Sequence, residues 1–155
     1  MTPENLVQVR RKTGLVLEDV AFGPLNHRLS PRNAEERAMA ALEQVGMAGA
    51  AGKAPYHLSA GEKKPVAIAG ILAVEPEILV LDEPTTFLDP PGQRALVQLL
   101  ASLPQAKILI THDMHLAREL CCRAVLFSNG SIAAEGSVEQ VAQRYEWDFV
   151  APRTA

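Results

Sequence analysis

The sequence is poor in cysteine and aromatic residues, and it contains no long apolar run. Its 155 residues include two cysteines, and aromatic residues make up 5% of the chain. The longest apolar run covers residues 66–74 and stops at Glu75. It is far shorter than the roughly 20 residues that a membrane-spanning helix needs. The first residues have neither a basic start nor an apolar stretch, so we expect no secretory leader.

The two cysteines, Cys121 and Cys122, are adjacent in the sequence. Neighbouring cysteines rarely meet disulfide geometry with each other. No CxxC pattern or cysteine–histidine spacing indicates a zinc site. We therefore expect two buried free thiols in a reduced, cytosolic compartment.

The chain also lacks a strong charge of either sign. Its net charge of −3 argues against non-specific nucleic-acid binding, which needs many cations to replace the counterions of phosphate. A hydrophobic content of 48% and a charged content of 21% are typical of an ordinary globular protein. The length is sufficient for one domain with its own core.

Apolar spacing and turn residues predict the secondary structure. Residues 1–33 contain several glycines and prolines, so we expect loops there, with one short strand near residues 14–20. Strands that alternate with helices predict an α/β domain with a mainly parallel sheet, flanking helices and a C-terminal β-hairpin. We expect helices over 33–47, 59–75, 90–102, 114–122 and 138–145, buried strands over 78–81 and 107–110, a hairpin over 124–134, and a loose tail over 147–155.

One predicted strand ends in two carboxylates. Residues 78–83 read ILVLDE, four apolar residues followed by Asp82 and Glu83. A carboxylate at the carboxyl end of a central parallel strand lies where α/β folds bind ligands. An aspartate there can hold Mg²⁺, usually through water, and an adjacent glutamate can polarise an attacking water. Taken alone, the pattern is more often a strand that simply leaves the core.

Two further motifs frame these carboxylates. The segment LSAGE at 58–62 precedes them, and THD at 111–113 follows at the end of the next apolar strand. Residues 82–90 read DEPTTFLDP. In this order the motifs resemble the signature, the Walker B motif with its D-loop, and the H-loop of an ATP-binding-cassette (ABC) ATPase. The resemblance covers residues 10–136 and implies a truncated P-loop NTPase core.

The resemblance implies a role for each motif residue. Asp82 would serve Mg²⁺, Glu83 would orient the hydrolytic water, and His112 would sense the γ-phosphate of ATP. Asp89 would communicate across a dimer. The signature residues Ser59 and Gly61 would contact the γ-phosphate bound by the opposite subunit, since a helix N-terminus favours an anion. The structural alternatives are that Ser59 only caps a helix and that His112 only ends a strand.

A finer resemblance concerns the type of transporter. Residues 18–26 (EDVAFGPLN) and 66–73 (VAIAGILA) look like the ATPases of energy-coupling-factor importers for cobalt, nickel or vitamins. This implies ATP and Mg²⁺ as cofactors, and a transmembrane transporter subunit and a second ATPase subunit as partners. It also implies a place on the cytoplasmic face of the cell membrane. The corresponding division is a helical-subdomain remnant over 1–57, the motif region over 58–136, and a C-terminal helix and tail over 137–155.

The sequence departs from this family at several points. It holds no G-x-x-x-x-G-K-[ST] phosphate loop, and its only Gly-Lys pair, at 52–53, is followed by Ala54. No glutamine follows residues 14–16, where the resemblance places the Q-loop. In the signature, Ala60 replaces a glycine, Glu62 replaces a glutamine, and Pro65 stands within the predicted helix at a cost of up to about 3 kcal/mol.

The missing phosphate loop also affects the expected stability of the fold. The resemblance places the phosphate-loop strand beside the strand that ends at His112. Without it, residues 107–111 offer an unpaired edge, and open apolar edges invite association. We expect a marginally stable chain that is prone to aggregate unless a partner covers that surface.

Three interpretations of the function stay open. The first is the ATP-hydrolysing subunit of an importer, inactive as an isolated chain because it lacks the phosphate loop. The second is a non-catalytic subunit that pairs with a complete ATPase and lends it Ser59 and Gly61. The third is a truncated remnant, for which the intact mass of the protein from its native source is the most direct check.

Overall fold

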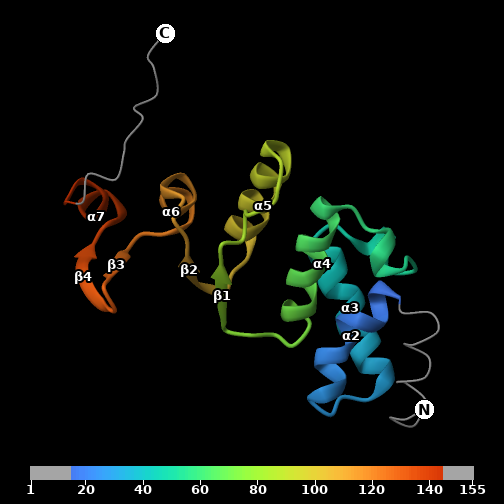
Figure 1. Cartoon of the computed structure of the whole chain (residues 1–155). Coiled ribbons are helices and arrows are strands. Elements are labelled where there is room, and N and C mark those ends of the chain that lie inside the picture. The colour runs from blue at the N-terminus through green and yellow to red at the C-terminus, as the bar shows by residue number, and fades with distance from the viewer. Residues whose placement is uncertain (1–14, 145–155) are drawn as a thin grey trace.

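The computed structural model describes residues 15–144 of the chain (Figure 1). Helices α2, α3 and α4 pack against one another at the N-terminal side, and strands alternate with helices from residue 78 onward. In chain order the elements are α2 (Val16–Asn26), α3 (Pro31–Gln44), η1 (Ala48–Ala50), η2 (Pro55–His57), α4 (Ala60–Leu72), β1 (Ile78–Asp82), α5 (Pro90–Ser102), β2 (Ala106–Ile110), α6 (Met114–Leu120), β3 (Ala124–Ser128), β4 (Ser131–Gly136) and α7 (Val138–Arg144).

The expectation for residues 1–33 was wrong over the part that the structure describes. Helix α2 occupies most of the segment in which we predicted a short strand, and α3 begins at Pro31. The buried residues of α2 are Val16, Val20, Ala21 and Pro24, which is helical spacing. The first turn is anchored because Val16 N donates to Lys53 O at 2.9 Å. Packing against α3 and α4 thus decides the structure of a segment in which we had expected loops and a short strand.

Helix α4 confirms the predicted capping box. Ser59 Oγ accepts a hydrogen bond from Glu62 N at 3.2 Å, and Glu62 Oε2 accepts one from Ser59 N at 2.8 Å. The helix ends at Leu72, before the predicted stop at residues 75–76, and Glu75 takes a left-handed φ of 55°. Pro65 lies inside the helix.

Strands β1 and β2 form the predicted parallel pair, with Leu79 opposite Lys107 and Val80 opposite Ile108. The prediction that both strands are buried on both faces was wrong. Leu79 and Leu81 are buried, whereas alternate residues of both strands are exposed. Within residues 15–144, helices cover only one face of this pair, because no described segment lies on the other.

The C-terminal part of the described chain follows the prediction closely. Strands β3 and β4 form an antiparallel hairpin, and Asn129 and Gly130 in its turn have φ of 50° and 75°. Two consecutive positive φ values are typical of a primed hairpin turn. Helix α6 ends at Leu120, two residues before its predicted end. Tyr145, the predicted last residue of α7, and the tail over 147–155 lie outside the described residues.

The two cysteines follow α6. Both are free, as predicted, but Cys122 is exposed and Cys121 is half-buried, so the expectation of two buried thiols was wrong. Burial raises the pKa of the Cys121 thiol above its ordinary value. No helix within residues 15–144 has the length and apolar character needed to cross a bilayer.

Candidate functional site

The carboxyl ends of β1 and β2 bring Glu83 and His112 into direct contact. His112 Nδ1 lies 2.7 Å from Glu83 Oε1, and His112 N donates to the same oxygen at 2.9 Å. A carboxylate oxygen accepts, so the Nδ1 position of the ring carries the proton. Neighbouring parallel strands end at the same edge of a sheet, and this places two residues 29 positions apart in one site.

Thr111 and Asp113 complete the local network. Thr111 Oγ1 donates to Glu83 Oε2 at 3.2 Å and accepts from Asp113 N at 3.0 Å. Asp113 Oδ1 in turn caps α6 by accepting from His115 N and Leu116 N. The carboxylate of Glu83 therefore has donors on both oxygens, and the start of α6 holds those donors in place.

The backbone of Glu83 is unusual. Its φ of 42° lies in the left-handed region, which a residue with a Cβ adopts rarely. Glu83 N donates to Ile110 O at 2.9 Å, so the residue extends the pairing of β1 with β2 by one position. Such a conformation costs on the order of 1–3 kcal/mol and persists where surrounding contacts fix it.

The contact shifts the titration of both partners. The hydrogen bond from His112 holds the pKa of Glu83 below its ordinary value, although partial burial opposes this. The same hydrogen bond raises the pKa of His112, and the negative charges of Glu83 and Asp113 raise it further. The contact therefore favours the ionised carboxylate of Glu83 together with the protonated ring of His112.

This pair gives a testable pH dependence. The raised pKa of His112 contributes stability that is present below its ordinary value of 6.5 and is lost as the pH rises through the folded-state pKa. The lowered pKa of Glu83 contributes stability that is present above its ordinary value of 4.5 and is lost as the pH falls through the folded-state pKa. The pair therefore stabilises the fold most between pH 4.5 and 6.5.

Glu83→Gln is expected to lower the pKa of His112 towards 6.5, because the main cause of its elevation is removed. An NMR titration of the His112 ring in both proteins measures this. The ring resonances of His57, which lies outside the pair, serve as the control and should not differ between the two proteins. An unchanged His112 midpoint would show that the contact does not form in solution.

Asp82 is the last residue of β1, and its side chain is exposed beside this network. Residues 15–144 contain no group of three or more side chains that could hold a metal ion by themselves. That is compatible with Mg²⁺, which proteins often bind through one or two carboxylates together with the phosphates of a substrate. Asp82 fits such a role. The described residues do not offer the ligands for a metal site built from protein side chains alone.

Ser59 and Gly61 lie at the N-terminus of α4, and both are exposed. Within residues 15–144, no hydrogen bond joins them to Glu83 or His112. Glu62 forms an ion pair with Lys53 at 3.3 Å. The backbone hydrogen bond from Ser59 is the main cause of the lowered pKa of Glu62, and Lys53 adds to it. The Glu62 carboxylate, at the position where the family signature has a glutamine, is therefore engaged in capping α4.

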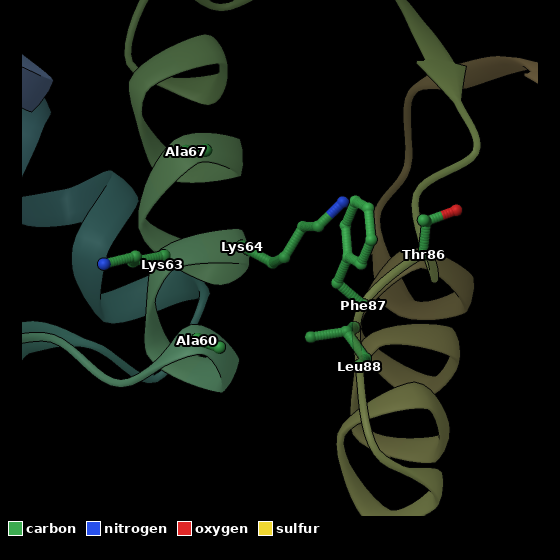
Figure 2. Close-up of a pocket in the computed structure, with 7 residues that line it drawn as sticks. All are labelled: Ala60, Lys63, Lys64, Ala67, Thr86, Phe87 and Leu88. Carbon is green, nitrogen blue, oxygen red and sulfur yellow. The ribbon is translucent and has the colours of Figure 1, made fainter.

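Asp89 caps α5, since its Oδ1 accepts a hydrogen bond from Gly92 N at 3.1 Å. A shallow cleft of about 310 Å³ lies between the start of α4 and the turn that precedes Asp89. Figure 2 shows the aromatic ring of Phe87 and the side chain of Lys64 facing each other across it. The cleft is lined by Ala60, Lys63, Lys64 and Ala67 of α4, and by Thr86, Phe87 and Leu88 of the turn.

The structure thus divides the candidate residues into two groups. Glu83 and His112 touch, with Asp82 beside them. Ser59, Gly61 and Asp89 lie at two helix starts, where each of the two side chains caps a helix. Sequence reasoning gave no role to Thr111 or Asp113, although an aspartate directly before a predicted helix is a signal for a cap.

Known proteins of similar fold and sequence identify the protein class to which this chain belongs. The fold matches cbiO1 from Clostridium perfringens, described as part of the ABC transporter complex cbiONQ, with a TM-score of 0.74 and 34% identity. The match covers 86% of this chain and 55% of that chain. The fold is therefore that of a P-loop NTPase core, as predicted. The ABC transporter family model matches residues 1–86, more than half of the sequence, and the chain belongs to this family.

Two relatives give the subgroup. The energy-coupling factor transporter ATP-binding protein EcfA of Methanothermobacter thermautotrophicus is 42% identical over an alignment of 150 positions, and the match covers 86% of this chain and 48% of the relative. EcfA1 of Methanospirillum hungatei is 40% identical over an alignment of 158 positions, and the match covers 91% of this chain and 57% of the relative. The predicted resemblance to energy-coupling-factor ATPases is confirmed. The chain spans about half the length of the relatives that it matches.

Proposed function

We propose that this chain carries the catalytic, metal-binding and signature residues of the ATP-hydrolysing subunit of an energy-coupling-factor transporter. The observation that carries the proposal is the contact between Glu83 and His112 at the ends of two adjacent parallel strands, 2.7 Å apart. Ligands of α/β proteins bind at this edge of the sheet. The relatives of this chain are named as ATP-binding proteins, which supports ATP as its nucleotide.

In this proposal Glu83 orients the attacking water. Its lowered pKa keeps it ionised at neutral pH, and the donors of His112 and Thr111 hold its carboxylate at the strand end. An ionised carboxylate positions water by accepting a hydrogen bond from it. The His112 side chain is 79% exposed, so the ring is open to a phosphate oxygen.

Asp82 would hold Mg²⁺ through water, and the metal ion when bound would neutralise charge on the phosphates of ATP. Ser59 and Gly61 would meet the γ-phosphate held by a second subunit, because the N-terminus of α4 is exposed and favours an anion. Asp89 would join the two subunits. These assignments follow the family motifs and the placement of each residue at a strand or helix end.

The partners follow from the same proposal. A transmembrane transporter subunit and a second ATPase subunit would bind this chain on the cytoplasmic face of the cell membrane. Residues 1–57 would belong to the helical subdomain, residues 58–136 would carry the motifs, and residues 137–155 would form the C-terminal helix and tail. Cobalt, nickel or a vitamin is the proposed class of cargo.

The isolated chain is expected to hydrolyse Mg-ATP no faster than its Glu83→Gln variant, because the sequence holds no phosphate loop to grip the nucleotide. A phosphate-release assay on both purified proteins checks this. Turnover that the substitution abolishes would show that this chain holds ATP by means outside the family motif.

A second candidate is a non-catalytic subunit that lends its signature to a complete ATPase. The exposed start of α4, with Ser59 and Gly61, favours it. Mixing this chain with the complete EcfA of Methanothermobacter thermautotrophicus and ATP should then give a heterodimer on size-exclusion chromatography. A chain that stays separate at every concentration tested excludes this role.

A further inference from the structure

Hydrogen bonds from two residues fill most of the acceptor positions on the Glu83 carboxylate. An ionised carboxylate offers about four such positions, two on each oxygen. His112 fills both positions of Oε1, because its backbone N and its Nδ1 lie 2.9 Å and 2.7 Å from that oxygen. Thr111 Oγ1 fills one position of Oε2, at 3.2 Å. Among the residues that the structure describes, a single acceptor position is therefore left open, and it belongs to Oε2.

The hydroxyl group of Thr111 is itself held in one orientation. A hydroxyl group has one proton to donate, and Asp113 N already donates to Thr111 Oγ1 at 3.0 Å. Within residues 15–144 the acceptor for the hydroxyl proton is Glu83 Oε2, so the proton lies on that side. Asp113 is fixed in turn, because its side chain accepts from His115 N and Leu116 N at the start of α6. Helix α6 thus orients the hydroxyl group that meets Glu83.

The backbone of Glu83 is fixed as well. Glu83 N donates to Ile110 O at 2.9 Å, which extends the pairing of β1 with β2. The carboxylate cannot turn without breaking its contacts with Thr111 and His112. The side chain of Glu83 is 32% exposed, so a water molecule can approach this fixed carboxylate from solvent.

We propose that Thr111 is a positioning residue that leaves Glu83 one acceptor position, on Oε2, for the water that Glu83 orients. The role of that water rests on the proposed function, whereas its place follows from the hydrogen bonds alone. Attack on a phosphoryl group needs the water in line with the leaving oxygen, so a single fixed place favours the reaction. Without the hydroxyl group, Oε2 has two open positions and the carboxylate turns more easily.

Two conservative substitutions separate this role from simple packing. Thr111→Val keeps the shape of the side chain and loses the hydroxyl group, and Thr111→Ser keeps the hydroxyl group and loses the methyl group. If the hydroxyl group positions Glu83, the serine variant resembles the unaltered chain and the valine variant does not. If Thr111 only fills space, the order of the two variants is reversed.

Hydrogen exchange of the His112 amide in the full chain measures how firmly the carboxylate is held. This amide is released when the carboxylate turns away, which in the unaltered chain also breaks the bond from Thr111. Thr111→Val should therefore raise the exchange rate about fivefold, the factor that corresponds to one hydrogen bond of about 1 kcal/mol. Thr111→Ser should leave the rate close to that of the unaltered chain. An unchanged rate in the valine variant, or a faster rate in the serine variant than in the valine variant, would overturn the proposal.

Thr86→Val is the matched control for this measurement. Thr86 lies in the turn that follows β1, and within residues 15–144 its side chain makes no hydrogen bond. The same change of threonine to valine should therefore leave the exchange of the His112 amide unchanged. An increase equal to that of Thr111→Val would show that the effect does not come from the bond to Glu83, and would overturn the proposal.

Crystal structures of the unaltered chain and of both Thr111 variants, at a resolution that shows ordered water, locate the open position directly. We expect one water bound to Oε2 and none to Oε1 in the unaltered chain and in the serine variant. In the valine variant we expect a second water on Oε2 or a turned carboxylate. A water on Oε1 of the unaltered chain, or a valine variant with the same carboxylate and the same single water, would overturn the proposal. Neither experiment uses nucleotide, so a failure to hydrolyse ATP in any assembly would count against the proposed function and not against this geometry.

Discussion

Leu100→Ala is expected to lower the free energy of unfolding by about 3 kcal/mol. Leu100 in α5 is fully buried, and it belongs to the core that joins this helix to Leu79 and Leu81 of β1. Removing its side chain loses the transfer free energy of three carbon atoms and leaves a cavity that the surrounding residues fill only in part. With a loss of this size, the folded-to-unfolded ratio falls by about 150-fold.

Urea denaturation followed by circular dichroism measures the effect, with Gln98→Ala as the control. Gln98 lies two residues away on the same helix and is exposed, so its removal should change stability by less than about 0.5 kcal/mol. Similar losses for both variants would mean that α5 does not pack on β1 in solution.

Pro65→Ala is expected to act in the opposite direction, raising the free energy of unfolding by about 1–2 kcal/mol. Pro65 lies inside α4, beyond its first turn, so it cannot donate to the carbonyl of Gly61 four residues earlier. Alanine restores this donor and removes the clash of the proline ring. The gain is smaller than the full helix penalty of about 3 kcal/mol because alanine also gives the unfolded chain more freedom.

Two control substitutions, one beside Pro65 in α4 and one in α2, show whether the gain in stability comes from the helix backbone. Lys64→Ala changes the adjacent side chain without changing a backbone donor, and it should be nearly neutral. Pro24→Ala removes a proline that is fully buried in the last turn of α2, so lost packing offsets any gain in hydrogen bonding. If Pro65→Ala is neutral or destabilising, the start of α4 is fitted to the proline ring.

Local signals predicted the elements that carry their own start and stop residues. Helix α5 has the predicted bounds because Asp89 caps it and two prolines open it. Ser59 and Glu62 fixed the start of α4 in the same way. Helix α2 lacks a capping side chain at Leu15 and an opening proline; Glu18 accepts from Leu15 N at 3.3 Å, and the helix packs against α3 and α4. Such tertiary contacts are not visible in a short window of sequence.

The candidate site was predictable in its position and not in its contacts. The apolar runs before Glu83 and His112 predicted two strand ends at one edge of a sheet, and the two side chains do meet there. The left-handed backbone of Glu83 and the double role of Thr111 depend on the turn geometry of both strands at once. The bare face of β1 was missed because an apolar strand indicates burial without identifying what buries it.

The left-handed φ of Glu83 has a consequence for how this position can change over time. Glycine or asparagine would adopt φ of 42° more easily than glutamate does, so the backbone conformation by itself favours either residue. The carboxylate opposes such a replacement, because its oxygens accept hydrogen bonds from Thr111 Oγ1 and His112 N. A glutamate at this position is therefore maintained by what its carboxylate contacts and not by its backbone conformation.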